Sequence, residues 1–224
     1  MNKLNHVAFI MDGNGRWGIK KKKSRNFGHL EGVKTVQKIV KASIKFKIPI
    51  ITLYVFSSEN WSRPKSETNY LFNLINIYFR KELQNIIKNN IKIIISGRVN
   101  LLPDNIQKIL AIAKKRTFNN KRLKINLAIN YGSKSELIDA IKKLIKNKKK
   151  ITEKNIEENL YNKLPAPDIL IRTGGKKRLS NFMLWQLAYT EFYFLSKLWP
   201  DFNEHNLKKI INNFKIVKRN FGNI

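Results

Sequence analysis

The chain has 224 residues and a formal net charge of +30, and it contains no cysteine, which excludes disulfide frameworks and thiolate metal sites. Its hydrophobic content of 42% and aromatic content of 11% are sufficient for a core and argue against intrinsic disorder. No apolar run approaches the roughly 18 residues of a membrane span, and residues 1–6 show no signal peptide, so we expect a cytoplasmic protein.

Strand and helix patterns alternate along the chain. In chain order they predict a strand over 6–11, a helix over 30–44, a strand over 50–56, a helix over 70–87 capped by Ser66, a strand over 91–96, a helix from Pro103 to 117, a strand over 123–130, a helix over 133–147, a short helix from Thr152, strands over 168–172 and 192–194, and a helix over 203–218. The strands are nearly continuous in isoleucine, valine and leucine, which is typical of parallel strands buried on both faces. We therefore predict an α/β fold: a single domain over residues 1–224 with a six-stranded, mostly parallel sheet flanked by helices.

Polar segments follow the carboxyl ends of four predicted strands, at residues 12–16, 57–63, 131–133 and 172–180. Ligands of parallel α/β sheets bind beyond these strand ends. We therefore expect a functional site where these segments gather. Phe56 and Trp61 could line an apolar substrate there, or they could simply pack.

Most of the positive charge reflects composition. Lysine, isoleucine and asparagine, whose codons are A/T-rich, account for 94 of the 224 residues, and the lysines are spread along the whole chain. A nucleic-acid-binding protein would gather its basic residues on one face, so we expect no nucleic acid partner, although weak contact with an anionic membrane is compatible with the charge. Arginine is more informative, because its planar fork binds phosphate bidentately. Five of the ten arginines lie in the motifs below, namely Arg16, Arg25, Arg63, Arg172 and Arg178.

The first predicted strand is followed by a glycine-rich turn, Asp12-Gly13-Asn14-Gly15-Arg16-Trp17-Gly18. Its glycine spacing matches the GxGxxG fingerprint of dinucleotide-binding proteins. That function would require an apolar helix next and an acidic residue about 20 positions further on, whereas the chain continues with IKKKKSR. We therefore favour a diphosphate cradle, in which backbone N–H groups, Arg16 and Arg25 bind phosphate oxygens.

Two carboxylates and one histidine are candidates for binding a metal ion or phosphate at this cradle. Asp12 could help to bind a bridging Mg²⁺, because Mg²⁺ is held by one or two carboxylates plus substrate phosphates; alternatively, it caps the turn. Glu191 lies in the apolar stretch LAYTEFYFL, where an unpaired carboxylate is costly, so it needs a metal ion, an arginine or an outward-facing position. His29 could contact phosphate or pack at a helix start.

The segment Ile171–Phe182 predicts a second anion cradle. It places Arg172 at a strand end, a Gly174-Gly175 turn after it, and then Arg178 and Ser180. The alternative is an ordinary basic loop. Two phosphate sites in one chain suggest two phosphorylated substrates.

Six segments together resemble the cis-prenyltransferases, and among them the bacterial undecaprenyl diphosphate synthases. They are HVAFIMDGNGRW, RNFGH, LYVFSSENWSRP, NYG, IRTGG with the following RLSNF, and LWPDF. They occur in the family's order and extend from about His6 to Gly222. The resemblance implies a homodimer whose subunits contain a six-stranded, mostly parallel sheet and a hydrophobic tunnel for the growing product.

The resemblance also implies a reaction, the repeated Mg²⁺-dependent addition of isopentenyl diphosphate to farnesyl diphosphate with a Z double bond formed each time. The product would be undecaprenyl diphosphate, a carrier-lipid precursor for cell-wall glycans, whose release could bring the enzyme to the inner membrane face. The implied catalytic residues are Asp12 and Asn60, and the implied Mg²⁺ ligands are Asp12 and Glu191. The implied substrate-binding residues are Gly13, Asn14, Gly15, Arg16, Trp17, Arg25, His29, Ser57, Ser58, Glu59, Trp61, Arg63, Arg172, Arg178, Leu179 and Ser180.

Four positions depart from the family pattern. Lys176 stands where a glutamate usually follows the glycine pair, Ser133 replaces a second glycine, and Arg98 replaces an acidic residue. Asn220 stands where the arginine of a C-terminal Arg-x-Gly motif is usual, and in the family that motif reaches the partner subunit's active site. Because the implied catalytic and metal-binding residues are all present, a non-catalytic subunit of this family is disfavoured.

Overall fold

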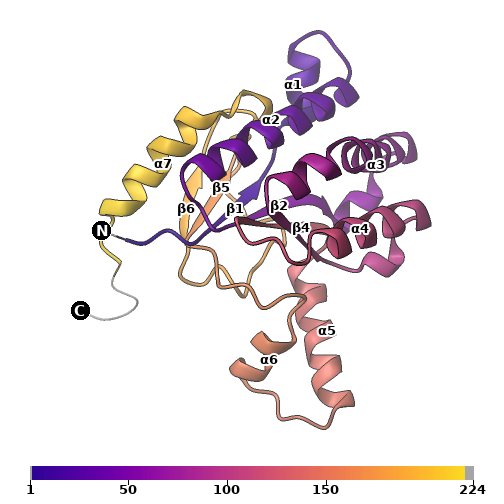
Figure 1. Ribbon diagram of the computed structural model, residues 1–224, viewed down its shortest axis with the longest axis vertical. Helices are drawn as coiled ribbons and strands as arrows, with labels where there is room; N and C mark the ends of the chain where they lie inside the picture. The colour runs from indigo at the N-terminus through magenta and orange to yellow at the C-terminus, as the bar shows by residue number, and fades with distance from the viewer. Residues whose placement is uncertain (1, 220–224) are drawn as a thin grey trace. The chain divides into compact units, whose positions relative to one another are not determined.

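The computed structural model describes residues 2–219, whose strands form one six-stranded sheet in the order β3-β4-β2-β1-β5-β6 (Figure 1). The strands are β1 (His6–Ile10), β2 (Ile50–Ser57), β3 (Ile91–Ser96), β4 (Leu123–Tyr131), β5 (Ile169–Arg172) and β6 (Glu191–Phe194). Strand β1 pairs in parallel with β2 and β5, β5 with β6, and β3 with β4. The predicted α/β fold is therefore confirmed, and each strand ends within one residue of its expected position.

The described part of the chain contains seven α-helices and three short 3₁₀ helices. They are α1 (Asn14–Lys20), α2 (Arg25–Lys45), η1 (Ser58–Ser62), α3 (Lys65–Lys88), η2 (Val99–Leu101), α4 (Asp104–Arg116), α5 (Ser133–Lys146), α6 (Glu153–Asn159), η3 (Trp199–Asp201) and α7 (Glu204–Ile216). Two expectations were wrong. Helix α1 occupies a segment interpreted as a turn, and α3 begins directly after Pro64, so Ser66 lies inside its first turn instead of capping it. Pro64 is the N-cap, with an extended ψ of 136°, and its missing N–H costs no helical hydrogen bond at that position.

The described chain divides into two compact units. The first unit comprises the residues up to Leu53, Ala166–Arg178 and the residues from Gln186 on, and the second comprises Tyr54–Pro165 and Leu179–Trp185. Strand β2 begins in the first unit and ends in the second. The single domain expected over residues 1–224 stays a prediction, and its last residues, including Asn220, lie outside the described part.

An aromatic cluster forms the core of the first unit. Phe9 of β1 contacts Trp199 edge-on at a centroid distance of 5.9 Å, and Trp199 stacks on Phe202 at 5.6 Å. All three rings are buried, and the indole nitrogen of Trp199 donates to the carbonyl of Gly32 in α2 at 3.0 Å. The cluster therefore packs η3 against β1, and the Trp199 hydrogen bond attaches η3 to α2. These contacts hold β1 and α2, which precede and follow the glycine-rich segment, in place.

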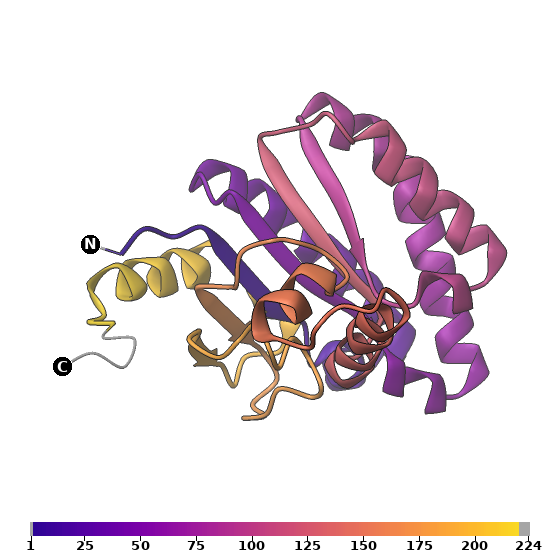
Figure 2. The same ribbon diagram turned by 90° about the horizontal axis from the view of Figure 1, so that it is seen from below.

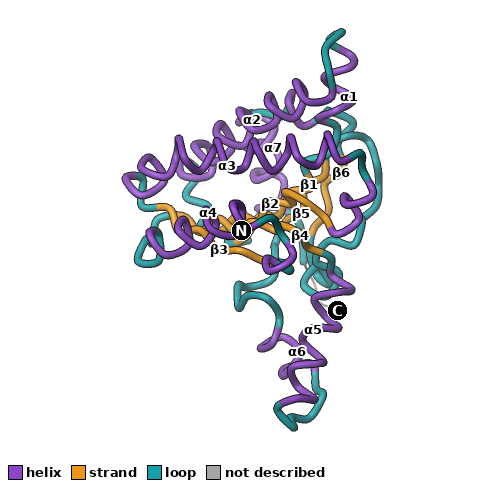
Figure 3. Tube along the Cα trace, turned by 90° about the vertical axis from the view of Figure 1, so that its right-hand side faces the viewer, coloured by secondary structure: helices purple, strands orange, loops and turns teal. Residues whose placement is uncertain are grey.

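In the second unit, β3 and β4 run side by side, as their register from Ile91↔Leu123 to Ser96↔Ala128 requires (Figure 2). Helices α5 and α6 follow β4 and pack against each other (Figure 3). Their shared core contains Ala140, Leu144, Ile156 and Leu160. Helix α5 begins two residues after β4 ends, so its first turn follows directly from that strand.

Candidate functional site

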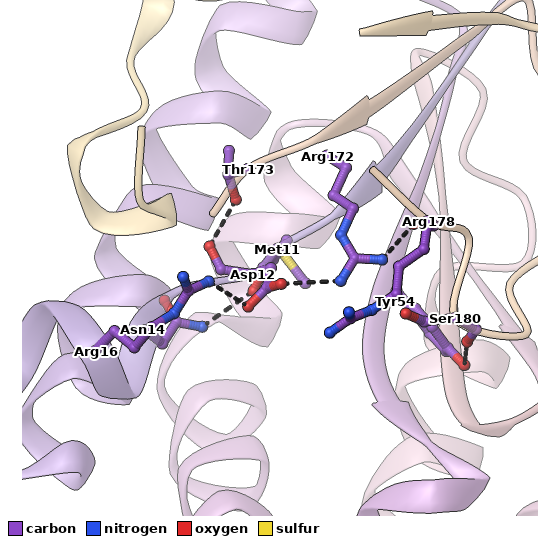
Figure 4. Close-up of polar contacts among 9 residues, drawn as sticks. All are labelled: Met11, Asp12, Asn14, Arg16, Tyr54, Arg172, Thr173, Arg178 and Ser180. Atoms are coloured by element: carbon purple, nitrogen blue, oxygen red, sulfur yellow. Dashed lines mark hydrogen bonds and ion pairs between the residues drawn. The ribbon is translucent and has the colours of Figure 1, made fainter. Parts of the chain in front are cut away.

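Asp12 and Arg172 meet at the carboxyl ends of two neighbouring strands. Ile10, the last residue of β1, pairs with Arg172, the last residue of β5, and Asp12 follows two residues later. Arg172 donates from Nη2 to Oδ2 of Asp12 at 2.9 Å, and Arg16 donates from Nη2 to Oδ1 at 3.1 Å (Figure 4). The hydroxyl of Thr173 donates to the Asp12 carbonyl at 2.8 Å. One carboxylate therefore holds two guanidinium groups that the sequence assigned to two different phosphate cradles.

The guanidinium of Arg172 is buried, with only 4% of its side chain exposed. Besides Asp12, it donates from Nη1 to the carbonyl of Arg178, which holds the start and end of the second cradle together. Arg178 itself is exposed, and Figure 4 shows its guanidinium pointing in the direction of Asp12 and Arg172. Because the buried fork is fully oriented before any ligand arrives, this cluster can bind an anion at low entropic cost.

Gly174 makes the close approach between the two cradles possible. Its φ of +90° lies in the left-handed region, and a Cβ there would lie 2.5 Å from Nη2 of Arg16 and 3.0 Å from Cγ of Asp12. A side chain would therefore displace the ion pair. The glycine at this predicted turn therefore leaves room for the Arg16 guanidinium as well as allowing the left-handed backbone.

Helices α1 and α2 bring Arg25 to the first cradle. A Cβ on Gly15 would lie 2.7 Å from Cζ of Arg25, so this guanidinium lies directly against the first turn of α1. His29, one turn further along α2, is buried. The expected diphosphate cradle stays a prediction, and so do both alternatives for His29. Gly18 and Gly28, in contrast, serve the contact between the two helices, since a Cβ on Gly18 would lie 2.2 Å from the Ser24 carbonyl.

Trp17 lies in the first cradle by sequence, but its side chain is bound elsewhere. Its indole nitrogen donates to Oδ1 of Asp201 in η3 at 2.7 Å, and its ring stacks on Phe27 at 5.9 Å. Lys21 lies 5.6 Å above the same ring. The observed role of Trp17 is therefore to attach α1 to α2 and η3, and its implied substrate contact stays a prediction.

Glu191 does not join Asp12 within this chain. Glu191 is the first residue of β6 and pairs with Ile169, which pairs in turn with Val7 near the start of β1. Asp12 lies beyond the opposite end of β1, which corresponds to roughly 15 Å at the rise of a strand. Glu191 instead lies 3.8 Å from Nε of Arg219. The two-carboxylate metal site expected from Asp12 and Glu191 is thus not formed within this chain, and of the alternatives for Glu191 the structure shows the arginine partner.

The second unit contains the site residues that follow β2. The backbone N–H of Ser57 donates to Oδ1 of Asn60 at 3.2 Å, and the Ser57 hydroxyl caps the same short helix in return. Trp61 donates from its indole nitrogen to Oδ1 of Asn130 at 2.8 Å and remains 44% exposed. Arg63 pairs with Glu67 at 3.2 Å. Helix η1 is therefore fixed at both ends, and Asn60 has its amide oxygen engaged.

Two asparagines that sequence reasoning missed support these residues. Asn130, one residue before the end of β4, has a φ of +47°, accepts from Trp61 and donates to the Arg98 carbonyl at 2.9 Å. Asn181, with a φ of +61°, follows Ser180 and donates to Oε1 of Glu59 at 2.7 Å. Asparagine tolerates the left-handed conformation better than most residues. Both asparagines also lie in segments that carry the family resemblance, NYG and RLSNF, but neither was assigned to the site from them.

Ser180 and Leu179 lie on the loop that precedes Asn181. Ser180 is exposed with a φ of +50°, and its carbonyl accepts from the Tyr54 hydroxyl at 3.2 Å. Leu179 is half-buried. The same Tyr54 hydroxyl lies 3.3 Å from the Tyr131 carbonyl at the end of β4. The strained backbone at Ser180 is therefore held by a side chain from β2, as is typical of functional loops.

The unusual Arg98 has a structural partner. It makes a two-pronged contact with Asp139 of α5, Nε to Oδ2 at 2.9 Å and Nη2 to Oδ1 at 2.8 Å, and the Tyr161 hydroxyl donates to Oδ2 at 2.6 Å. The hydrogen bonds from Arg98 hold the pKa of Asp139 below its ordinary value. An acidic residue at position 98 would repel Asp139, so the departure at 98 fits the residue at 139.

This pair predicts a pH-dependent stability difference. Because the folded-state pKa of Asp139 is lowered, its contribution is present above the ordinary aspartate pKa and is lost as the pH falls through the folded value. We expect Asp139→Asn to lower the free energy of unfolding by about 1 kcal/mol at pH 7, since both groups are partly exposed. The deficit should shrink as the pH falls below the ordinary aspartate pKa, as measured by urea unfolding of both proteins at pH 7 and at an acidic pH below that value. An equal deficit at both pH values would contradict this assignment.

Magnesium fits the donor set around Asp12 only in part. Among residues 2–219, no three histidine, aspartate or glutamate side chains gather into a metal site. Asp12 nonetheless offers a partly exposed carboxylate with 28% of its side chain accessible, next to arginines that would bind a diphosphate. Because Mg²⁺ is often held by one protein carboxylate plus substrate phosphates, Asp12 fits a metal ion that arrives with its substrate.

Comparison with known proteins gives consistent matches along the chain. The family model of undecaprenyl diphosphate synthase matches residues 10–222. An isoprenyl transferase of Fusobacterium nucleatum is 43% identical over 98% of this chain and 96% of its own length. One of Rickettsia bellii is 45% identical over 99% of both chains.

No helix in the described residues is both long enough and apolar enough to cross a membrane.

Two solved structures share the fold. A crystal structure of a probable undecaprenyl diphosphate synthase from Campylobacter jejuni superposes with a TM-score of 0.87, at 36% identity over 99% of this chain and all of the other. Lavandulyl diphosphate synthase from Lavandula x intermedia, in complex with dimethylallyl diphosphate, gives a TM-score of 0.93 at 31% identity. It matches 97% of this chain and 98% of its own.

Proposed function

Because the chain belongs to the undecaprenyl diphosphate synthase family of prenyltransferases, we propose that it adds isopentenyl diphosphate repeatedly to farnesyl diphosphate. Each addition forms a Z double bond, and the product is a long polyprenyl diphosphate of the undecaprenyl class, a carrier-lipid precursor for cell-wall glycans. The observation that carries this proposal is the Asp12 carboxylate held between Arg16 and Arg172. It supports two diphosphates bound next to each other, one on each arginine.

In this proposal the first unit binds the allylic diphosphate on the backbone around Gly13 and Gly15, with Arg16, Arg25 and His29. Arg172 and Arg178 bind isopentenyl diphosphate together with Ser180. When the allylic C1–O bond breaks, negative charge develops on the leaving diphosphate. Fixed guanidinium groups stabilise that charge without reorganising, which is the main source of electrostatic catalysis.

The proposed metal site consists of Asp12 and the substrate phosphates. When bound there, Mg²⁺ would neutralise diphosphate charge and help the leaving group to depart. The two arginines that bind the carboxylate already orient Asp12. We expect chelation of divalent ions to abolish condensation and re-addition of Mg²⁺ to restore it.

Asn60 is proposed to orient the proton that isopentenyl diphosphate loses from C2 when its C4 bonds to the allylic C1. A neutral amide is a poor base, and its Oδ1 already accepts from the Ser57 backbone. We therefore propose that a diphosphate oxygen takes the proton. Asn60→Ala should lower the single-turnover condensation rate by about 10²-fold, the size of a general acid–base effect, with substrate binding intact.

The control for Asn60 is Asn100→Ala, at an exposed position in η2 of the same unit. Rapid-quench measurement of labelled isopentenyl diphosphate incorporation separates the rate from binding. An unchanged single-turnover rate in Asn60→Ala would refute any role in proton transfer.

The same proposal includes a homodimer in the cytoplasm with peripheral contact at the membrane. Two exposed isoleucines of α5 support a protein contact, since Ile138 is 50% exposed and Ile145 is 63% exposed on one helix face. Sedimentation equilibrium tests the assembly. A dimer is expected, and a monomer at micromolar concentration would contradict it.

The activity is tested by incubating the purified chain with farnesyl diphosphate, labelled isopentenyl diphosphate and Mg²⁺, and then sizing the products. A ladder ending in one long product is expected. Because one structural neighbour is in complex with dimethylallyl diphosphate, that diphosphate is offered in a parallel reaction. A single-condensation product formed from dimethylallyl diphosphate alone would overturn the proposal.

A further inference from the structure

Asn181 joins three parts of the second unit. Its carbonyl accepts from the Ser133 backbone N–H at 2.8 Å, and its side-chain Oδ1 accepts from the Lys134 backbone N–H at 2.9 Å. Its Nδ2 donates to Oε1 of Glu59 at 2.7 Å. One residue therefore caps the first turn of α5 and also holds a carboxylate of η1.

The surroundings of Asn181 leave room for this arrangement. Gly132 precedes α5, and a Cβ there would lie 2.6 Å from Nδ2 of Asn181 and 2.5 Å from Oγ of Ser58. Ser133, which replaces the family's second glycine, is fully buried, and its hydroxyl accepts from the Leu184 backbone at 2.9 Å. The segment from Asn181 to Leu184 is thus attached to the first turn of α5 at both of its ends.

The conformation at Asn181 determines where Ser180 lies. Both residues have positive φ values, +50° for Ser180 and +61° for Asn181. Such conformations persist in non-glycine residues only where surrounding contacts hold them. Asn181 makes three of these contacts, and Tyr54 makes one to the Ser180 carbonyl.

We propose that Asn181 is a positioning residue, which holds Ser180 and Glu59 in one fixed arrangement for binding isopentenyl diphosphate. The inference rests on the proposed function, in which Ser180 binds isopentenyl diphosphate and η1 contacts the substrates. Burial alone would raise the pKa of Glu59, but hydrogen bonds from Asn181, the backbone and two serines hold it below its ordinary value. Glu59 is therefore an ionised acceptor, and bonds to ionised groups are about twice as strong as neutral ones.

Asn181→Asp separates the two roles of the side chain. An aspartate still accepts from the Lys134 N–H and caps α5, but it cannot donate to Glu59 and instead repels it. We expect kcat/KM for isopentenyl diphosphate to fall by about 10- to 100-fold, the cost of losing a hydrogen bond to a charged group, while the melting temperature stays within a few degrees. The control is Asn119→Asp, which makes the same charge change at an exposed position.

Combining Glu59→Gln with Asn181→Asp restores the contact in the opposite direction, because the glutamine amide donates to the new carboxylate. In a chain that already carries Glu59→Gln, adding Asn181→Asp should therefore change kcat/KM by no more than about 3-fold. A double-mutant cycle compares this change with the larger loss expected in the wild-type background and so measures the coupling between the two residues. An equal loss with and without Glu59→Gln, or no loss in the single variant, would overturn the proposal. A residue that mattered only for folding would show no such rescue.

The Asn181 contact can also be tested without activity. If the wild-type chain condenses no diphosphates, the proposed function fails, and an NMR titration of the Glu59 carboxyl still tests the contact. The pKa of Glu59 should rise in Asn181→Asp and stay unchanged in Asn119→Asp. The same pKa of Glu59 in all three proteins would refute the positioning role directly.

Discussion

Replacing Asp12 by asparagine is expected to lower the condensation rate by on the order of 10³-fold, the upper range for removal of one preorganised electrostatic group. Asparagine has nearly the same shape, so the fold should persist. It carries no charge, however, and cannot hold Arg16 and Arg172 as a shared counterion. The buried Arg172 would then lack its ionic partner, and the proposed metal ion would lack its protein ligand.

The measurement for Asp12→Asn is incorporation of labelled isopentenyl diphosphate at saturating Mg²⁺, with circular dichroism to confirm folding. Asp104→Asn, on the first turn of α4, removes the same charge at an exposed position and should keep wild-type activity. Retention of more than a tenth of the activity in Asp12→Asn would show that the carboxylate is not central.

Arg172→Lys is the second change with a large expected effect. The charge is kept, but a lysine cannot donate to Asp12 and to the Arg178 carbonyl in one plane while presenting a further edge to a phosphate. We expect kcat/KM for isopentenyl diphosphate to fall by about 10²-fold, mainly through a higher KM, because the loss of charge-assisted hydrogen bonds weakens binding before chemistry.

Arg116→Lys provides the matched control for Arg172→Lys. Arg116 is exposed at the end of α4 and makes one long hydrogen bond to Gln84 at 3.4 Å. Steady-state kinetics with isopentenyl diphosphate as the varied substrate distinguishes the two variants. Equal kinetic constants in Arg172→Lys and wild type would contradict a bidentate role for the guanidinium.

The sheet was predictable because its strands are continuous apolar runs that end at polar segments. The same pattern placed Asp12 and Arg172 at the carboxyl ends of their strands, but their ion pair depends on β1 pairing with β5, which only the structure shows. Helix α1 was missed because it is short and contains two glycines, which have low helix propensity. It forms through tertiary packing, with Gly18 and Gly28 allowing the α1 backbone to contact α2, and such packing overrides local propensity.

Strand register limited the rest of the prediction. Nothing in the sequence shows that Glu191 begins β6 at the level of Ile169, at the opposite end of the sheet from Asp12. Asn130, near the end of β4, and Asn181, in the loop after Ser180, were missed for a related reason, because their roles depend on hydrogen-bond partners that only the structure shows. The residues proposed to bind phosphate were therefore easier to select from the sequence than those proposed to position them.

A crystal structure of the full chain with Mn²⁺ in place of Mg²⁺ and a non-reactive isopentenyl diphosphate analogue tests the central claim most directly. Manganese can be located by its anomalous scattering. We predict one peak within bonding distance of both the Asp12 carboxylate and a diphosphate oxygen, with Arg172 bound to the same diphosphate. A metal peak away from Asp12, or a diphosphate that does not contact Arg172, would contradict the account.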